Sequence, residues 1–108
     1  MADEATLVRL CRTDEVGLNE ARRFDVNGRP IALFHLPAGF FAIDDTCSHE
    51  ESSLSQGFVD EDMVECPKHG AQFEIQTGHN RSLPATRPVA AHRVVVDGDD
   101  VYVEAPDA

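Results

Sequence analysis

The sequence predicts an all-β fold, a sandwich or a barrel, from three observations. Short runs rich in apolar and β-branched residues recur about every 8 to 12 residues, turn-forming residues separate them, and neither a heptad pattern nor an internal repeat is present. Eight strands are expected, over residues 6–10, 21–26, 30–36, 40–44, 63–66, 71–75, 92–96 and 101–104. Because a domain typically holds about 100–150 residues, the 108 residues are expected to form one domain, residues 1–108.

Particular residues set the first turns. Thr13 is the expected cap of a short helical turn over 13–16, after the first strand. The pair Asn27-Gly28 predicts a hairpin between the second and third strands, because both residues tolerate the positive φ of a type I′ turn. Pro37-Ala38-Gly39 then turns the chain into the fourth strand.

Longer irregular segments occupy the middle of the chain. Residues from 45 to about 57 and from 79 to 88 show no strand pattern, and Pro84 favours a loop in the second segment. Shorter turns are expected at residues 67–70, 76–78 and 97–100. The last of these turns is rich in Asp but lacks the spacing of an EF-hand, so we expect a hairpin turn there rather than a calcium site.

The composition restricts the classes of partner. Nine Lys and Arg against 20 Asp and Glu give a net charge of −11, which excludes the basic surface that binds nucleic acid or an anionic membrane. Apolar residues make up 42% of the chain, enough for a core. The longest apolar runs, such as residues 31–34, are far shorter than the roughly 18 residues that span a membrane. Residues 1–10 lack the apolar segment of a secretory signal, so a cytoplasmic protein is expected.

The residues with distinctive chemistry lie in two short motifs, Cys47-Ser48-His49 and Cys66-Pro67-Lys68-His69. Each motif supplies a thiolate and an imidazole from a predicted loop, and 16 residues separate the two. A gap of one or two residues lets both side chains of a tight loop converge on one metal site. The chain has three cysteines, an odd number that does not suit a closed set of disulfides. In a reducing compartment, such cysteines are more often metal ligands, catalytic groups or core residues.

Three interpretations of these motifs are open. One is chance, with the cysteines as buried thiols and the histidines as surface groups. Another is a structural zinc site, although zinc fingers usually pair like ligands and each loop here mixes them. The third is a [2Fe–2S] cluster in which both Cys bind one iron and both His bind the other, so that a mixed loop supplies one ligand to each iron.

The full pattern, C-x-H-x16-C-x2-H, resembles that of the Rieske iron–sulfur proteins. Further segments are similar to the small Rieske ferredoxins of bacterial ring-hydroxylating dioxygenases: residues 54–57, 64–71, 77–78, 83–86 and 99–103. The resemblance covers the chain from about residue 5 to residue 104. It implies a Rieske fold, with an antiparallel β-sandwich base and a cluster-binding tip, in the part of the chain from about 45 to 86. Two ligand loops would form this tip, and the loop that contains Pro84 would cover the cluster.

The function that the resemblance implies is electron transfer. The cofactor would be a Rieske-type [2Fe–2S] cluster held by Cys47, His49, Cys66 and His69. The chain would carry one electron from a flavin-dependent reductase to the terminal oxygenase of an aromatic-ring dioxygenase, docking transiently with each. It would transform no organic substrate, so no catalytic residue is expected. Two alternatives are kept, the small Rieske subunit of a nitrite-reductase-type enzyme and a zinc-stapled binding module.

Departures from the respiratory Rieske proteins predict a low reduction potential. Ser52 and Lys68 stand where those proteins have two further cysteines joined in a disulfide, and Ala71 and Phe73 stand where they have a Ser and a Tyr near the cluster sulfurs. Fewer hydrogen bonds to sulfur destabilise the reduced, more negative cluster, so we expect a potential of roughly −150 mV. Glu50 directly follows the first ligand His, where many dioxygenase ferredoxins have Gly.

Eight acidic residues lie between Pro30 and Pro67, a stretch without Lys or Arg. They are interpreted either as a solvated face or as a surface that steers the protein toward basic patches on its partners. The acids of this stretch are Asp44, Asp45, Glu50, Glu51, Asp60, Glu61, Asp62 and Glu65.

The other candidate residues are expected to be structural. Cys11 is expected to be a core or edge thiol, His35 and His92 are expected to pack in strands, and His79 is expected to be exposed. Four aromatic residues are expected to lie in the core or to shield the cluster, namely Phe40, Phe41, Phe58 and Phe73.

Overall fold

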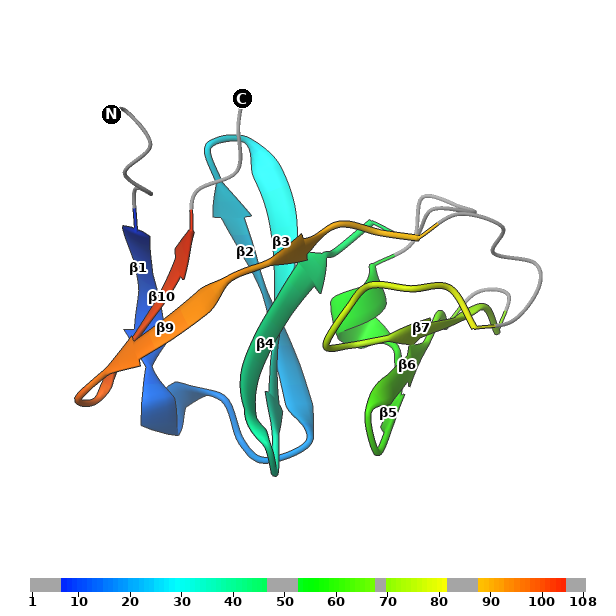
Figure 1. Ribbon diagram of the computed structural model, residues 1–108, viewed down its shortest axis with the longest axis horizontal. Coiled ribbons are helices and arrows are strands. Elements are labelled where there is room, and N and C mark those ends of the chain that lie inside the picture. The colour runs from blue at the N-terminus through cyan, green and yellow to red at the C-terminus, as the bar shows by residue number, and fades with distance from the viewer. Residues whose placement is uncertain (1–6, 47–52, 68–69, 82–87, 105–108) are drawn as a thin grey trace.

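The computed structural model describes residues 7–46, 53–67, 70–81 and 88–104, and within these ranges the chain forms three antiparallel sheets (Figure 1). The first sheet has the order β1–β10–β9, that is Leu7–Arg12, Asp100–Glu104 and Val94–Asp97. The second has the order β2–β3–β4–β8, that is Glu20–Val26, Arg29–Leu36, Gly39–Asp44 and Ala91–His92. The third has the order β5–β6–β7, that is Phe58–Asp60, Met63–Glu65 and Gln72–Glu74.

Two short 3₁₀ turns, η1 (Thr13–Glu15) and η2 (Leu54–Gln56), are the helical elements of the described residues. Neither they nor any other helix in these ranges is long and apolar enough to cross a membrane. The predicted all-β fold is confirmed.

The β2–β3 hairpin forms as the sequence predicts. Val26 pairs with Arg29 across the turn, and φ is 53° at Asn27 and 82° at Gly28. Both turn residues therefore adopt the positive φ that an Asn-Gly pair tolerates and most other residues resist.

β3 is the central strand of the molecule, because both of its faces are buried. Successive side chains of a strand point to opposite faces. Ile31 and Leu33 lie in one buried cluster with residues of the first sheet, including Val101. Ala32 and Phe34 lie in a second buried cluster with residues of the third sheet and its flanking loops. The second sheet is therefore shared by two cores and lies between the other two sheets (Figure 1).

Three expectations about the elements need correction. The strand β5 was not predicted, because its three residues are too few to show an alternating pattern. The residue that caps η1 is Arg12 rather than Thr13, and its backbone N–H donates to Glu15 Oε1 at 2.7 Å. The strand expected over 92–96 is divided between two sheets, because β8 pairs with β4 whereas β9 pairs with β10.

The aromatic residues are less uniformly buried than expected. Phe73 is fully buried, and Phe40 and Phe41 are half-buried. Phe58 is 66% exposed, so its expected place in the core is wrong. In the antiparallel register, Phe58 lies opposite Glu65, and its neighbour Val59 lies opposite the buried Val64, so the ring belongs to the outer face of the third sheet.

Candidate metal centre

Of the four predicted ligands, the structure describes Cys66. Cys47, His49 and His69 lie outside the described residues, as do Glu50 and Glu51. Within the part of the chain that is described, no group of three or more His, Cys, Asp and Glu is placed to hold a metal ion. The described part of the candidate centre therefore consists of Cys66 and of the residues that flank three segments, 47–52, 68–69 and 82–87.

Cys66 stands at the base of a tight loop that joins β6 to β7. Its backbone N–H donates to the carbonyl oxygen of Ala71 at 2.7 Å, and its carbonyl oxygen accepts from the N–H of Gly70 at 3.0 Å. Gly70 has a φ of 76°, a left-handed conformation that favours glycine. Cys66 itself is only 1% exposed and belongs to the same buried cluster as Phe73. A thiol that is shielded from water and held at the base of a closed loop suits a soft metal ligand.

The residues on the two sides of the first motif are bonded to each other, through Asp45 and Thr46 before it and residues 53–55 after it. The carbonyl oxygen of Asp45 accepts from the N–H of Leu54 at 2.7 Å, and its carboxylate Oδ1 accepts from the N–H of Ser55 at 2.8 Å. Thr46 and Ser53 also form an isolated β-bridge. The Asp45 carboxylate is 1% exposed, so it is a buried acceptor, and it satisfies the backbone N–H of Ser55 in η2. The two ends of this segment are thus held side by side.

Asp44, at the end of β4, binds two other parts of the chain. Its carboxylate accepts two hydrogen bonds from the Arg29 guanidinium, at 2.9 and 2.8 Å, and one from Nε2 of His92 at 2.8 Å. The N–H of Ala90 is a weaker donor at 3.4 Å. Burial alone raises the pKa of the Asp44 carboxyl, but the hydrogen bonds from Arg29 and His92 outweigh it and lower the pKa. Asp44 thereby fixes the strand that follows residues 82–87 to the strand that precedes the first motif.

Replacing Asp44 with Asn is expected to cost about 2 kcal/mol of stability at neutral pH, because the charge-assisted hydrogen bonds are lost. The pKa of this carboxyl is lower in the folded chain than its unfolded value of about 3.9. Its contribution is therefore complete above that value and is lost as the pH falls through the folded pKa. Thermal unfolding between pH 7 and 3 should show the wild-type advantage over Asp44→Asn shrinking at acidic pH.

The control for this measurement is Asp25→Asn. Asp25 forms an exposed ion pair with Arg23 at 3.2 Å, which is worth little in water. Equal losses in the two variants, or parallel pH profiles for Asp44→Asn and the wild type, would contradict the assigned role of Asp44.

The segment around Pro84 also begins and ends at fixed points. Before it, the N–H of Arg81 donates to the carbonyl oxygen of Gln72 at 2.7 Å, and the Arg81 guanidinium pairs with Glu74. After it, the N–H of Val89 donates to the carbonyl oxygen of Gly78 at 2.9 Å. Gln72 begins β7, the strand that directly follows the Cys66 loop. β7 therefore supports both the Cys66 loop and the residue that precedes the segment around Pro84.

The remaining sequence candidates are placed as expected. Cys11 is buried in the core beneath the first sheet, and this burial raises the pKa of its thiol. Nδ1 of His35 donates to the Val16 carbonyl oxygen at 2.8 Å, and its ring stacks on Phe40 with centroids 4.1 Å apart. His79 is exposed. These residues have structural or surface roles.

The roles of Asp44 and Asp45 are not predictable from the sequence, in which both belong to the acids interpreted as a solvated or docking face. The structure corrects this interpretation, because Asp45 is buried and Asp44 is paired with Arg29 and His92. The only local signal is that the two acids come directly after the buried residues Ala42 and Ile43 of β4.

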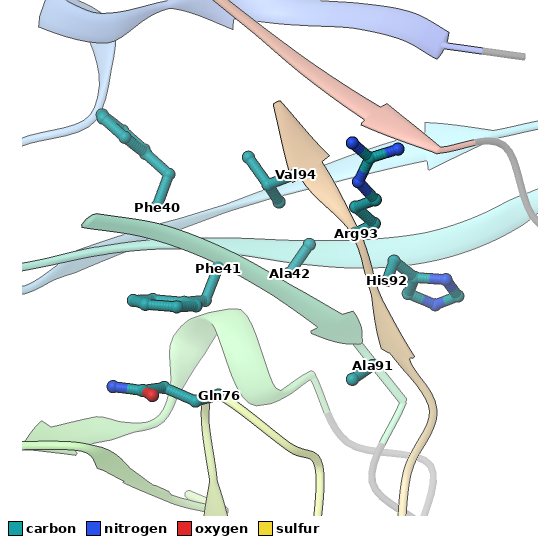
Figure 2. A pocket seen from close by; sticks show the side chains of 8 residues that line it. All are labelled: Phe40, Phe41, Ala42, Gln76, Ala91, His92, Arg93 and Val94. Atoms are coloured by element: carbon teal, nitrogen blue, oxygen red, sulfur yellow. The ribbon is translucent and has the colours of Figure 1, made fainter. Parts of the chain in front are cut away.

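A hollow of about 310 Å³ lies between β4, the β8–β9 segment and the turn at Gln76 (Figure 2). Figure 2 shows Phe41 of β4 on one side of it, with Gln76 across from the ring. The imidazole that lines it, that of His92, is hydrogen-bonded to Asp44. The hollow therefore presents aromatic, amide and guanidinium groups.

Comparison with known proteins places this arrangement in a family. The model of the Rieske [2Fe-2S] domain matches residues 6–93. The chain is 41% identical, over 91% of its length and 92% of the relative, to the 3-phenylpropionate/cinnamic acid dioxygenase ferredoxin subunit of Escherichia coli K12. It is 38% identical, with the same coverage, to the ferredoxin component of biphenyl 2,3-dioxygenase from Rhodococcus jostii RHA1.

Two solved ferredoxin structures are similar to this chain in fold and in sequence. The ferredoxin of carbazole 1,9a-dioxygenase from Nocardioides aromaticivorans IC177 superposes with a TM-score of 0.90 at 33% identity, covering 94% of this chain and 100% of that one. A ferredoxin that forms a complex with the reduced oxygenase of carbazole 1,9a-dioxygenase superposes with a TM-score of 0.87 at 34% identity, covering 94% of each chain. Proteins described as nitrite reductase small subunits share the fold at 24% and 18% identity.

Proposed function

This chain belongs to the Rieske [2Fe–2S] domain family, and from that premise we propose that it carries single electrons from a flavin-dependent reductase to the terminal oxygenase of an aromatic-ring dioxygenase. The observation that carries the proposal is its similarity, over nine-tenths of both chains, to ferredoxin components of two such dioxygenases. In a related carbazole 1,9a-dioxygenase, the ferredoxin forms a complex with the oxygenase. The chain is accordingly a carrier rather than an enzyme, and it docks transiently with both partners.

The proposed ligands of the cluster are Cys47, His49, Cys66 and His69. When bound, the [2Fe–2S] cluster supplies a centre that gains and loses one electron at a time. The described residues fit such a group, because Cys66 offers a thiol that is 1% exposed, at the base of a loop closed by two backbone hydrogen bonds. A mixed Cys and His donor set is that of a Rieske centre.

We extend the proposal to the organisation and the location of the chain. Residues 1–108 act as one Rieske domain, with the cluster-binding part from about 45 to 86. The protein works in the cytoplasm, where a reducing environment keeps cysteine thiols available as ligands.

The experiment that tests this function uses the full chain, purified without oxygen. Iron and sulfide analysis should give about two of each per chain, and the reduced protein should give an anisotropic EPR signal with a low average g value. Titration of the reduced protein with ferricyanide should consume about one equivalent per chain. A colourless protein that holds one zinc and no iron would instead identify the zinc-stapled binding module.

The reduction potential is expected near the low end of the Rieske range, at roughly −150 mV. Ala71 and Phe73 are both fully buried, and the Ala71 carbonyl oxygen accepts a hydrogen bond from the Cys66 N–H. Neither of these side chains has a hydroxyl that could donate to the cluster. Redox titration should show that Ala71→Ser and Phe73→Tyr raise the potential, because a hydroxyl donor stabilises the reduced cluster. Ala38→Ser, at an exposed turn, should leave it unchanged. A strongly positive potential in the wild type would refute this expectation.

A further inference from the structure

The outer face of the third sheet is turned away from the core. Val59, Val64 and Phe73 are the middle residues of the three strands and point inward, so the residues on either side of each point outward. The outward residues of the sheet include Glu74, which is paired with Arg81. The other five, which we call the Phe58 face, are Phe58, Asp60, Met63, Glu65 and Gln72. Together with Val64 they line a hollow of about 380 Å³.

Two apolar side chains, Phe58 and Met63, lie on this face. Phe58 is 66% exposed, more than Leu18 at 56% or Val96 at 46%, and Met63 beside it is half-buried. A phenylalanine ring left in water forfeits the free energy that its burial would give. An exposed aromatic ring beside a hollow is the kind of group that anchors protein–protein contacts.

The end of the face at the β5–β6 turn is acidic. Asp60, Glu61 and Asp62 are exposed at the β5–β6 turn, and none of them forms an ion pair with another residue that the structure describes. The sequence has no Lys or Arg between Arg29 and Lys68. A second copy of the chain would bring the same carboxylates against these, so the face fits a partner of opposite charge.

The Phe58 face also adjoins the candidate metal centre. β6 runs directly into Cys66, and β7 follows the loop that Cys66 begins. A protein that binds this face therefore contacts the strands that hold the second predicted ligand loop.

We infer that the Phe58 face is the surface on which a redox partner docks, with an apolar site that receives the Phe58 ring and Lys or Arg side chains that meet the surrounding carboxylates. The inference rests on the proposed function and names the chemistry of the partner surface. Apolar contact at Phe58 supplies affinity, and the acidic β5–β6 turn speeds and orients the encounter. Asp44 and Asp45 do not belong to this face, because Asp44 is paired with Arg29 and Asp45 is buried.

The test uses mitochondrial cytochrome c as a basic one-electron acceptor protein. The chemically reduced full chain is mixed with it in a stopped-flow instrument at low ionic strength, at concentrations below saturation. Phe58→Ala should slow the reduction of cytochrome c about tenfold. Asp60→Asn should slow it about two- to fivefold, and this deficit should vanish as added salt screens the charges.

Each variant has a matched control. Leu18→Ala removes a side chain of similar exposure far along the chain, and Asp97→Asn removes an exposed charge from the first sheet. Both should react at the wild-type rate. All four variants should keep the wild-type EPR spectrum and melting temperature, because the replaced side chains are exposed.

The outcomes separate the docking surface from the carrier function. If the wild type reduces cytochrome c and Phe58→Ala is no slower than Leu18→Ala, the docking surface is refuted and the carrier function stands. If the wild type gives no reducible Rieske spectrum, or does not pass its electron on, the carrier function itself fails.

Discussion

Cys66→Ala is expected to yield a colourless protein without a Rieske EPR signal, whereas Cys11→Ala keeps the full spectrum. The comparison is well matched, because both thiols are buried, at 1% and 3% exposure. Cys66 begins the loop closed by Ala71 and is one of the four proposed ligands, whereas Cys11 packs in the core beneath the first sheet. Iron content, visible absorption and EPR of anaerobically purified protein measure the difference. Retention of the cluster in Cys66→Ala would show that the ligand set is misassigned.

The histidines allow a parallel comparison. His49→Ala should lose the cluster. His69→Cys should lose it or convert it to a centre with three Cys ligands and one His, whose potential should be lower because a thiolate replaces a neutral imidazole. His79→Ala is the control, because His79 is exposed and its backbone N–H, which donates to Thr77 Oγ1, is retained in the variant. Loss of the spectrum in all three variants would contradict the assignment.

Gly78→Ala is expected to lower stability by about 3 kcal/mol, the largest effect that we predict outside the ligands. Gly78 has a φ of +80°, and a Cβ built on it would lie 2.1 Å from the carbonyl oxygen of Val89. The same glycine donates its N–H to Glu74 and accepts from the N–H of Val89, so the clash falls where the segment around Pro84 is closed. The apparent melting temperature should fall by roughly 12–24 °C, since 1 kcal/mol shifts it by about 4–8 °C in a domain of this size.

Gly28→Ala is the control for Gly78→Ala. Its φ of +82° is nearly the same, but a Cβ there meets nothing within 4 Å. The left-handed conformation alone should cost about 1 kcal/mol. The difference between the two variants therefore isolates the close approach of Val89. Equal melting temperatures would show that the chain relaxes around the new methyl group without loss.

The sequence predicts best where the signal is local. Asn27-Gly28 specifies its hairpin because two adjacent residues provide the required φ angles. The spacing of the Cys and His motifs is likewise local, and it led to the family that the comparisons establish. Of the four proposed ligands, the structure places Cys66, and the assignment of the other three stays a prediction.

The sequence predicts poorly where a role depends on distant residues. Asp44 pairs with Arg29, 15 residues before it, and with His92, 48 residues after it, and nothing beside Asp44 indicates either partner. The burial of Asp45 depends on η2, which supplies the backbone donors, so charge counting alone assigned both acids to a surface. Phe58 was misplaced for a related reason, since β5 is too short to show which face its side chains take.

The two-sided burial of β3 limits how this protein can be shortened or transplanted. The core beneath the third sheet takes Ala32 and Phe34 from β3 and Ile43 from β4, all of which precede residue 45. A fragment that spans only residues 45–86 would lack these side chains and would expose the apolar surface of Val64 and Phe73 that they cover. A minimal electron-transfer unit for grafting onto another enzyme must therefore include the β2–β4 sheet, and truncation at the apparent edge of the cluster-binding part should give an aggregating polypeptide.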